Sequence, residues 1–233
     1  MDFLTLDKQR FANGKECIFK LTGFFSSLTA FVLQIVIASS QCWRLWVFND
    51  NIVKFVSFGL WEAHYPQEFN VSGTVIKMLV HTPINSNWTI STEYQYAQNL
   101  MVGAILMKPI VLVCSSMAIK ISYMKYPYVE MQIYCYKVSA LVMCLSGLFT
   151  FVSVSWNHIV DLYGQTTLDF PPDFPVKKED LIMKYFTAVF PFGILISTMS
   201  LFGAIFFVSE ISNLKLQSQE KARCASKLTK QDV

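Results

Sequence analysis

The sequence predicts a mainly α-helical membrane protein with four transmembrane helices and a small antiparallel β-sheet outside the membrane. The 233 residues are 53% hydrophobic, and only 15% are charged. Because a soluble domain usually has about 25% charged residues, this deficit indicates lipid as the main solvent. Four apolar runs are long enough to cross a bilayer, and one long loop between them has the composition of β-strands.

We expect the spans at residues 21–42, 99–121, 138–158 and 185–209. A helix needs about 20 apolar residues to cross the hydrocarbon core of a bilayer. The first run follows basic residues, but it is longer than a signal-peptide core and lacks a clear small-x-small cleavage site, so we expect it to be retained. The segments outside the spans are then 1–20, 43–98, 122–137, 159–184 and 210–233.

The second span contains Lys108 and Pro109 near its middle. A lysine at the centre of a span costs about 2.5 to 3.5 kcal/mol, whereas the leucines, isoleucines and valines around it contribute roughly −3 to −6 kcal/mol together. The free energy of inserting this span into the membrane is therefore close to zero, and contacts with neighbouring helices favour insertion. Lys108 either lines a water-filled path or binds a partner, or it snorkels or faces a polar spot of the bundle. The second interpretation is favoured, because the other three spans offer no carboxylate at that depth.

The distribution of basic residues predicts the orientation of the chain. Four spans put both chain ends on one side, together with residues 122–137. Counting Lys120 at the end of the second span, that side then holds twelve lysines and arginines, and the opposite side holds six. By the positive-inside rule, both termini are expected to be cytoplasmic. The Asn-x-Ser/Thr sequons at Asn70 and Asn87 both lie in the loop assigned outside, which agrees with this orientation as possible sites of N-glycosylation.

The first outer loop, residues 43–98, has strand character in three stretches: 43–48, 51–61 and 74–80. These stretches are rich in aromatic and β-branched residues, and turn-prone residues such as Asn49-Asp50-Asn51 separate them. Three or more strands that pack on helices can form a stable sheet, whereas a two-stranded ribbon alone is marginal. We therefore expect a small antiparallel sheet in this loop.

Several motifs in this order resemble the claudins, the tetraspan proteins of tight junctions. In the first loop they are Trp43-Arg44, Asn51-Ile52-Val53 and Gly59-Leu60-Trp61, and the second span starts with Ala97-Gln98-Asn99-Leu100-Met101-Val102. The third span ends with Val154-Ser155-Trp156, and the second outer loop contains Phe170-Pro171-Pro172-Asp173-Phe174-Pro175 followed by Lys177-Lys178-Glu179. The similarity covers residues 20–209 and is strongest to the divergent claudins numbered thirty-four. The wider superfamily includes the peripheral myelin and epithelial membrane proteins.

The resemblance implies a claudin-like fold at the plasma membrane and a structural, adhesive role in paracellular strands that form a barrier or a paracellular channel. It implies other claudins as partners, both side by side in one membrane (in cis) and across the intercellular gap (in trans). In the first loop, Trp43, Gly59, Leu60 and Trp61 would then fix the sheet. In the second loop, the segment from Phe170 to Pro175 would present a turn to the partner.

Two departures from the claudin pattern stand out. Claudins follow Gly-Leu-Trp with two cysteines that form a disulfide, but residues 62–96 contain no cysteine. A bridge over about ten residues contributes roughly 2 to 3 kcal/mol, so this sheet must be held by packing and helix contacts or be looser. Gln98 stands where the family has an arginine. Cys42 is either an apolar residue at the membrane edge or forms an intermolecular disulfide.

Other candidate sites have ordinary explanations. His64 and His81, with Glu62 and Glu68, lack the spacing of metal ligands, so no metal or cofactor is expected. The C-terminal Val233 is either a ligand for a PDZ scaffold protein or part of a solvated tail, and the basic segment 215–230 is expected to be disordered. The net charge of +3 gives no indication of nucleic-acid binding. The chain also lacks a nucleophile elbow or phosphate loop, which argues against an enzyme.

Two functions follow from these observations. The first is a claudin-type adhesion and barrier protein, favoured by the proline-rich second loop and the terminal valine. The second is a tetraspan accessory subunit that regulates another membrane protein, like the myelin or calcium-channel gamma relatives of claudins. The missing cysteines, Lys108 and possible glycans in the outer loop favour this alternative.

Overall fold

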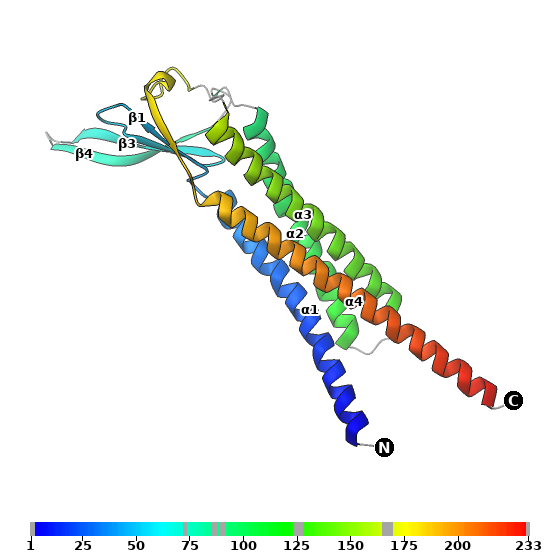
Figure 1. Cartoon of the computed structure of the whole chain (residues 1–233). Coiled ribbons are helices and arrows are strands. Elements are labelled where there is room, and N and C mark those ends of the chain that lie inside the picture. Colours follow the sequence, from blue (N-terminus) through cyan, green and yellow to red (C-terminus); the bar gives the residue numbers. More distant parts are fainter. Residues whose placement is uncertain are drawn as a thin grey trace. The chain divides into compact units, whose positions relative to one another are not determined.

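The computed structural model describes residues 3–71, 74–84, 88, 92–123, 128–164 and 170–231. It contains four long helices, α1 (Phe3–Ala38), α2 (Thr92–Tyr123), α3 (Val129–Tyr163) and α4 (Val189–Gln231) (Figure 1). Each has a segment long and apolar enough to cross a membrane, and these segments are Ile18–Ala38, Tyr94–Tyr123, Val129–Tyr163 and Val189–Glu220. The prediction of four apolar membrane-spanning helices is therefore supported.

The helix ends differ from the predicted spans. Helix α1 ends at Ala38, because the chain then turns into the sheet, although the predicted span continues to residue 42. Helix α2 begins at Thr92 rather than residue 99, and it already buries Tyr94 and Ala97. Helix α4 begins at Val189, not residue 185. Hydropathy identifies the lipid-spanning part of a helix but not the turns that pack on other protein segments.

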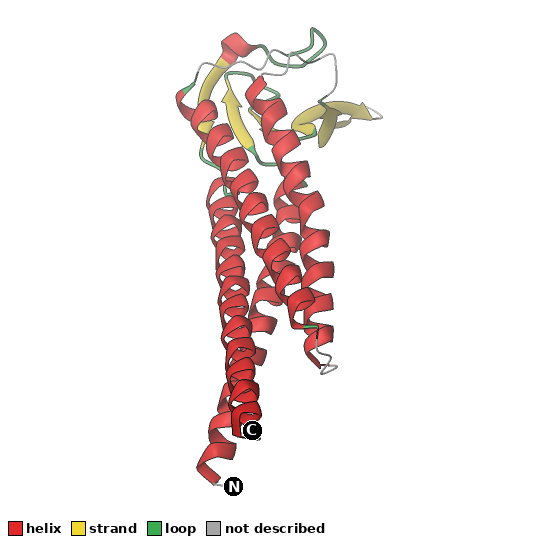
Figure 2. Cartoon of the chain, turned by 90° about the vertical axis from the view of Figure 1, so that its right-hand side faces the viewer, coloured by secondary structure: helices red, strands yellow, loops and turns green. Residues whose placement is uncertain are grey.

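The predicted antiparallel sheet is confirmed, and the described part of the chain gives it five strands, drawn in yellow in Figure 2. They are β1 (Arg44–Phe48), β2 (Phe55–Phe58), β3 (Glu62–Val71), β4 (Thr74–Pro83) and β5 (Leu181–Tyr185). Their order is β4-β3-β2-β1-β5, so β4 and β5 form the two edges. Strand β5 comes from the second loop and pairs with β1, with Leu45 opposite Tyr185.

The sequence did not predict β3 and β5. Strand β3 carries Pro66 and few β-branched residues, a composition that argues against a strand. Its long pairing with β4, from Glu62 opposite Pro83 to Val71 opposite Thr74, outweighs that local preference. The short apolar run of β5 directly precedes an apolar helix, so periodicity cannot separate the two.

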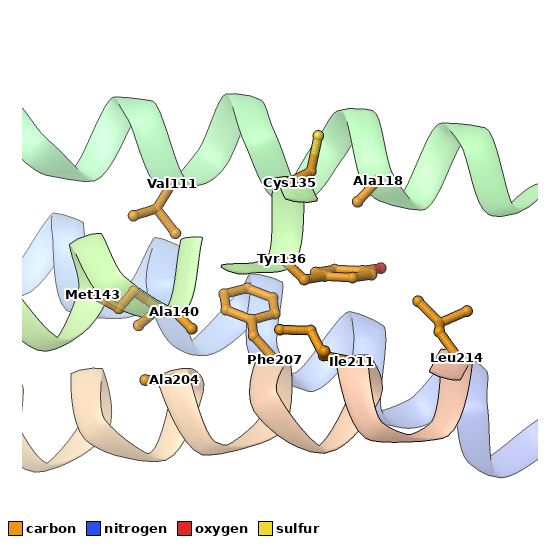
Figure 3. Packing of buried hydrophobic residues seen from close by; sticks show 10 residues of the cluster. All are labelled: Val111, Ala118, Cys135, Tyr136, Ala140, Met143, Ala204, Phe207, Ile211 and Leu214. Atoms are coloured by element: carbon orange, nitrogen blue, oxygen red, sulfur yellow. The ribbon is translucent and has the colours of Figure 1, made fainter. Parts of the chain in front are cut away.

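The chain forms two compact units, and each contains parts of all four helices. The first unit comprises Met1–Phe31, Ile105–Gly147 and Ser197–Val233. Figure 3 shows its core, in which the Tyr136 ring of α3 stacks on the Phe207 ring of α4 with centroids 5.6 Å apart. Within this unit, the first turn of α1 and the last turn of α4 lie at the same end of the helices (Figure 1).

Polar side chains connect the helices of this first unit. Lys20 of α1 forms an ion pair with Glu210 of α4, with 3.1 Å between nitrogen and oxygen. Its ammonium also donates a hydrogen bond to the Ser122 hydroxyl of α2 at 2.8 Å. Lys108 is fully buried and donates to the Ser200 hydroxyl at 2.8 Å. Lys108 thus faces a polar position of α4, which agrees with the interpretation that it faces a polar spot of the bundle.

Helix α4 continues far beyond its predicted span. The sequence predicted that the span ends at residue 209 and that the basic segment 215–230 is disordered, but the helix extends to Gln231. The turn after the span still contributes Ile211 and Leu214 to the core of the first unit. This burial stabilises a segment whose composition alone resembles a solvated tail.

The second unit comprises Val32–Ala104 and Leu148–Ile196 and contains the whole sheet. One face of the sheet carries a cluster of aromatic and aliphatic side chains that includes Trp46, Phe58 and Trp88. This unit holds the sequence motifs of both outer loops.

Candidate functional site

A buried arginine joins the sheet to α3. Arg44 of β1 is 2% exposed, and its Nε and Nη2 atoms donate to Oδ1 of Asn157 at 3.0 and 2.7 Å. The guanidinium group lies 3.8 Å from the Asp161 carboxylate and 5.0 Å from the centre of the Tyr94 ring. Partners on both α2 and α3 therefore compensate for the burial of this charge.

Asp161 binds two further residues of the sheet, one through its carboxylate and one through its backbone oxygen. The indole nitrogen of Trp46 donates to Asp161 Oδ1 at 2.8 Å. Lys184 of β5 donates to the backbone oxygen of Asp161 at 2.7 Å, and its ammonium lies 5.3 Å from the Trp46 ring. Burial lowers the pKa of Lys184, an effect that the Asp161 carboxylate opposes. We call Arg44, Trp46, Asn157, Asp161 and Lys184 the sheet junction.

Two motif tryptophans bind the end of α1. The last carbonyl groups of a helix lack partners within the helix. The Trp43 indole donates to the Ile37 carbonyl at 2.7 Å, and the Trp61 indole donates to the Ala38 carbonyl at 3.2 Å. These bonds explain why α1 can end beside the sheet without leaving those carbonyls unpaired.

Gly59 and Leu60 use their backbone oxygens to bind α2. The Tyr94 hydroxyl donates to the Gly59 carbonyl, and the Gln98 side-chain amide donates to the Leu60 carbonyl at 2.5 Å. Gln98, which replaces the family's arginine, thus anchors the same loop. A Cβ atom on Gly59 would lie 2.8 Å from the backbone oxygen of Ser40, so only glycine fits this close approach.

Replacing Gly59 with alanine is expected to lower the free energy of unfolding by about 1 to 3 kcal/mol, because a backbone segment must move. Thermal unfolding of the purified protein in lipid nanodiscs measures this change. Gly103→Ala is the matched control, since a Cβ there meets Phe149 at an ordinary 3.5 Å. Equal stability of the two variants would contradict the tight approach at Gly59.

The turn between β1 and β2 depends on Asp50. Its carboxylate accepts hydrogen bonds from the backbone N–H groups of Val53 and Ile52, each at 2.7 Å. These bonds lower the pKa of Asp50. Asn51, which the sequence singled out, is exposed. The Asn-Ile-Val motif therefore owes its conformation to the preceding aspartate.

The second-loop motif divides into buried and exposed residues. Phe170 stacks on Phe58 with ring centroids 6.0 Å apart, and Phe174 packs edge-on against Tyr65 at 5.0 Å. Pro171 is half-buried, whereas Pro172, Pro175 and Glu179 are exposed. Trp156 on α3 is 56% exposed and lies outside this cluster. The phenylalanines thus support the sheet, and the exposed prolines form the surface of the turn.

The sheet holds together without a disulfide among the described cysteine side chains. Cys42, Cys114, Cys135 and Cys144 are all free thiols. Cys42 is exposed and lies 3.2 Å from the Ser57 hydroxyl. The sheet junction and the aromatic cluster supply the packing and helix contacts that the sequence required in place of a bridge.

The hairpin formed by β3 and β4 exposes apolar side chains on both faces. We call Phe69, Val75, Ile76, Met78 and Leu79 the apolar hairpin residues; they are 38% to 60% exposed. Phe69 pairs with Ile76 on one face, and Leu79 pairs with Pro66 on the other. The outer edge of β4 has no strand partner within the described residues. Such a strand is a template for further pairing.

Some predicted sites lie outside the described residues, namely Asn87 and Val233. Asn70 is described; its side chain is exposed near the end of β3. Within the part of the chain that the structure describes, no group of three His, Cys, Asp or Glu side chains is arranged to hold a metal ion.

Sequence reasoning missed Tyr94, Asn157 and Asp161. A usable signal existed for Asp161, because an acidic residue so close to the end of an apolar helix usually has a partner. Comparison with models of protein families and with curated proteins finds no match to this chain.

Proposed function

We propose that this chain is a claudin-like integral membrane protein that acts as an adhesive component of tight-junction strands. Its sheet would lie outside the cell, and both termini would be cytoplasmic. Claudin-like chains would be its partners within one membrane and across the intercellular gap. The order of the first- and second-loop motifs supports this proposal.

The apolar hairpin carries the proposal. Exposed apolar patches mark interaction sites in proteins, and an open strand edge can accept a further strand. On this hairpin, the two features coincide. Apart from the contact of His64 with Glu62 at its base, the only described ion pair on the hairpin is Lys77 with Glu68 at 2.9 Å. A surface so poor in charge fits another apolar protein surface better than a charged ligand.

The rest of the second unit suits an adhesive role. The sheet junction ties the sheet to α3, so force on the hairpin would be transmitted to a membrane-spanning helix. The exposed Pro172 and Pro175 would offer a second contact surface on the turn of the second loop. The excess of basic residues on the side of the termini and the exposed Asn70 support the proposed orientation.

A tetraspan accessory subunit is the second candidate. An open apolar groove of about 560 Å³ runs between α1 and α4 in the first unit. Its walls include Phe25 and Phe206, and both lie in segments apolar enough to cross a membrane. Such a groove has room for a lipid or for a helix of a partner in the same membrane.

Expression in cells that lack tight-junction strands distinguishes the two candidates. We expect the wild-type protein to concentrate at cell contacts and to form strands visible by freeze-fracture microscopy. The double variant Met78→Glu, Leu79→Glu is expected to weaken association by more than about tenfold, because burying one such side chain contributes about 1.5 to 3 kcal/mol.

Ile52→Glu is the control, since Ile52 is an exposed apolar residue of the same unit outside the hairpin. It should reach the surface and concentrate at contacts like the wild type. Diffuse surface staining of the wild-type protein would contradict the adhesive role and favour the accessory subunit.

A further inference from the structure

Two histidines face each other at the base of the apolar hairpin. His64 of β3 is directly opposite His81 of β4 in the antiparallel register. Their ring centroids are 6.0 Å apart. His64 is only 7% exposed, whereas His81 is exposed. Histidine changes charge between pH 5 and 8, so this pair can respond to mild acid.

The groups around His64 define its electrostatics. Its Nε2 atom lies 3.6 Å from the Glu62 carboxylate, and Ser57 of β2 is opposite it in the sheet. It also lines a small pocket whose other walls are Ser39, Ser40, Gln41, Gly59, Leu60, Trp61 and Glu62. Among the described residues, Glu62 and His81 are therefore the titratable groups that act on His64.

Burial opposes the charged form of His64. It lowers the pKa of this imidazole, the Glu62 carboxylate raises it, and His81 lowers it further. A lowered pKa in the folded hairpin means that the unfolded segment binds protons more readily. Neutral His64 therefore makes its full contribution to the stability of the hairpin at a pH above about 6.5, the pKa of histidine in the unfolded chain. This contribution decreases as the pH falls below that pKa.

The position of the pair determines what its protonation would disturb. The register pairs on either side are Tyr65 with Val80 and Ala63 with Thr82. The hydroxyls of Tyr65 and Thr82 lie 3.0 Å apart across this diagonal, and Tyr65 belongs to the aromatic cluster. On the other side, the Ile84 N–H donates to the Trp61 carbonyl at 2.8 Å. Like charges directly opposite each other destabilise antiparallel pairs. Two imidazolium groups would therefore repel each other at the base of the hairpin, where it joins the rest of the sheet.

We propose that His64 and His81 form an acid-sensitive latch, which holds the base of the β3–β4 hairpin closed at neutral pH and loosens it in mild acid. The latch concerns the fold of the hairpin itself. Its consequence for cell contacts, a weaker association in acid, rests on the proposed adhesive function.

Hydrogen exchange measured by mass spectrometry tests the latch on the full chain in lipid nanodiscs. After correction for the intrinsic exchange rate, backbone amides in peptides within residues 62–83 are expected to exchange on the order of fivefold faster at pH 5 than at pH 7.5. Peptides from α3 should show no such change. This readout does not depend on adhesion, so it separates failure of the latch from failure of the proposed function.

Three variants identify the groups responsible. His64→Gln should abolish most of the acid response, and His81→Gln should reduce it by removing the facing charge. Glu62→Gln should enlarge the response, because it removes the carboxylate that favours protonated His64. An unchanged response in both histidine variants, or equal exchange of the wild type at the two pH values, would overturn the proposal.

Discussion

Replacing Arg44 with alanine is expected to lower the free energy of unfolding by about 3 to 5 kcal/mol. The variant removes a buried charge and leaves Asp161 and Asn157 buried without the guanidinium group that now binds them. One partner of the buried pair then remains without its opposite charge. The loss of stability is therefore larger than the free energy that the contact itself contributes. Thermal unfolding in lipid nanodiscs measures stability, and surface biotinylation measures how much protein reaches the cell surface.

Two further variants separate charge from packing. Lys54→Ala removes an exposed positive charge from the same unit and should change stability little. Adding Asp161→Asn to Arg44→Ala should recover part of the loss, since it removes the uncompensated carboxylate. Additive effects of Arg44→Ala and Asp161→Asn would mean that the two residues do not interact.

A similarly large effect is expected for Glu210→Ala in the first unit. Glu210 and Lys20 form an ion pair in which both side chains are nearly inaccessible, so the variant leaves the Lys20 ammonium buried without its carboxylate. The expected loss is about 3 to 5 kcal/mol, measured by thermal unfolding of the full chain. The remaining hydrogen bond to Ser122 would not neutralise the charge.

The double variant Lys20→Met, Glu210→Leu distinguishes the cost of an unpaired charge from the value of the pair. Apolar side chains of similar volume often replace buried ion pairs without loss of stability, so this variant should be close to the wild type. Glu220→Ala, at an exposed position of the same helix, is the control. A double variant as unstable as Glu210→Ala would show that the ion pair itself stabilises the bundle.

The predictability of the fold differs between helices and strands. The four spans were predictable because the preference for lipid adds up along a run of about 20 residues. Their ends were not, because contacts with other protein segments bury Tyr94 in a turn of α2 before the predicted span, and bury Ile211 and Leu214 in α4 after its predicted span. Strand β4 was predictable from its β-branched residues, whereas β3, with Pro66, forms through its pairing with β4.

For the candidate site, the motifs indicated which stretches matter but not how they act. Trp43, Gly59 and Trp61 were expected to fix the sheet, and the structure places them against the ends of α1 and α2. The partners of Arg44 and Trp46 lie 113 and 115 residues away in sequence. No local pattern relates residues at such separations. The exposure of apolar side chains on both faces of the hairpin also depends on which other segments pack against those faces.

The sequence by itself determined the four segments that are apolar enough to cross a membrane and the β-rich loop between two of them, because hydropathy and strand composition are properties of short segments. Only the tertiary structure decided that a buried Arg44 joins that sheet to α3, that β5 completes it, and that two histidines meet at the base of an exposed hairpin. Each of these features pairs groups from distant segments. Their energies depend on burial and distance, which exist only once the chain has folded.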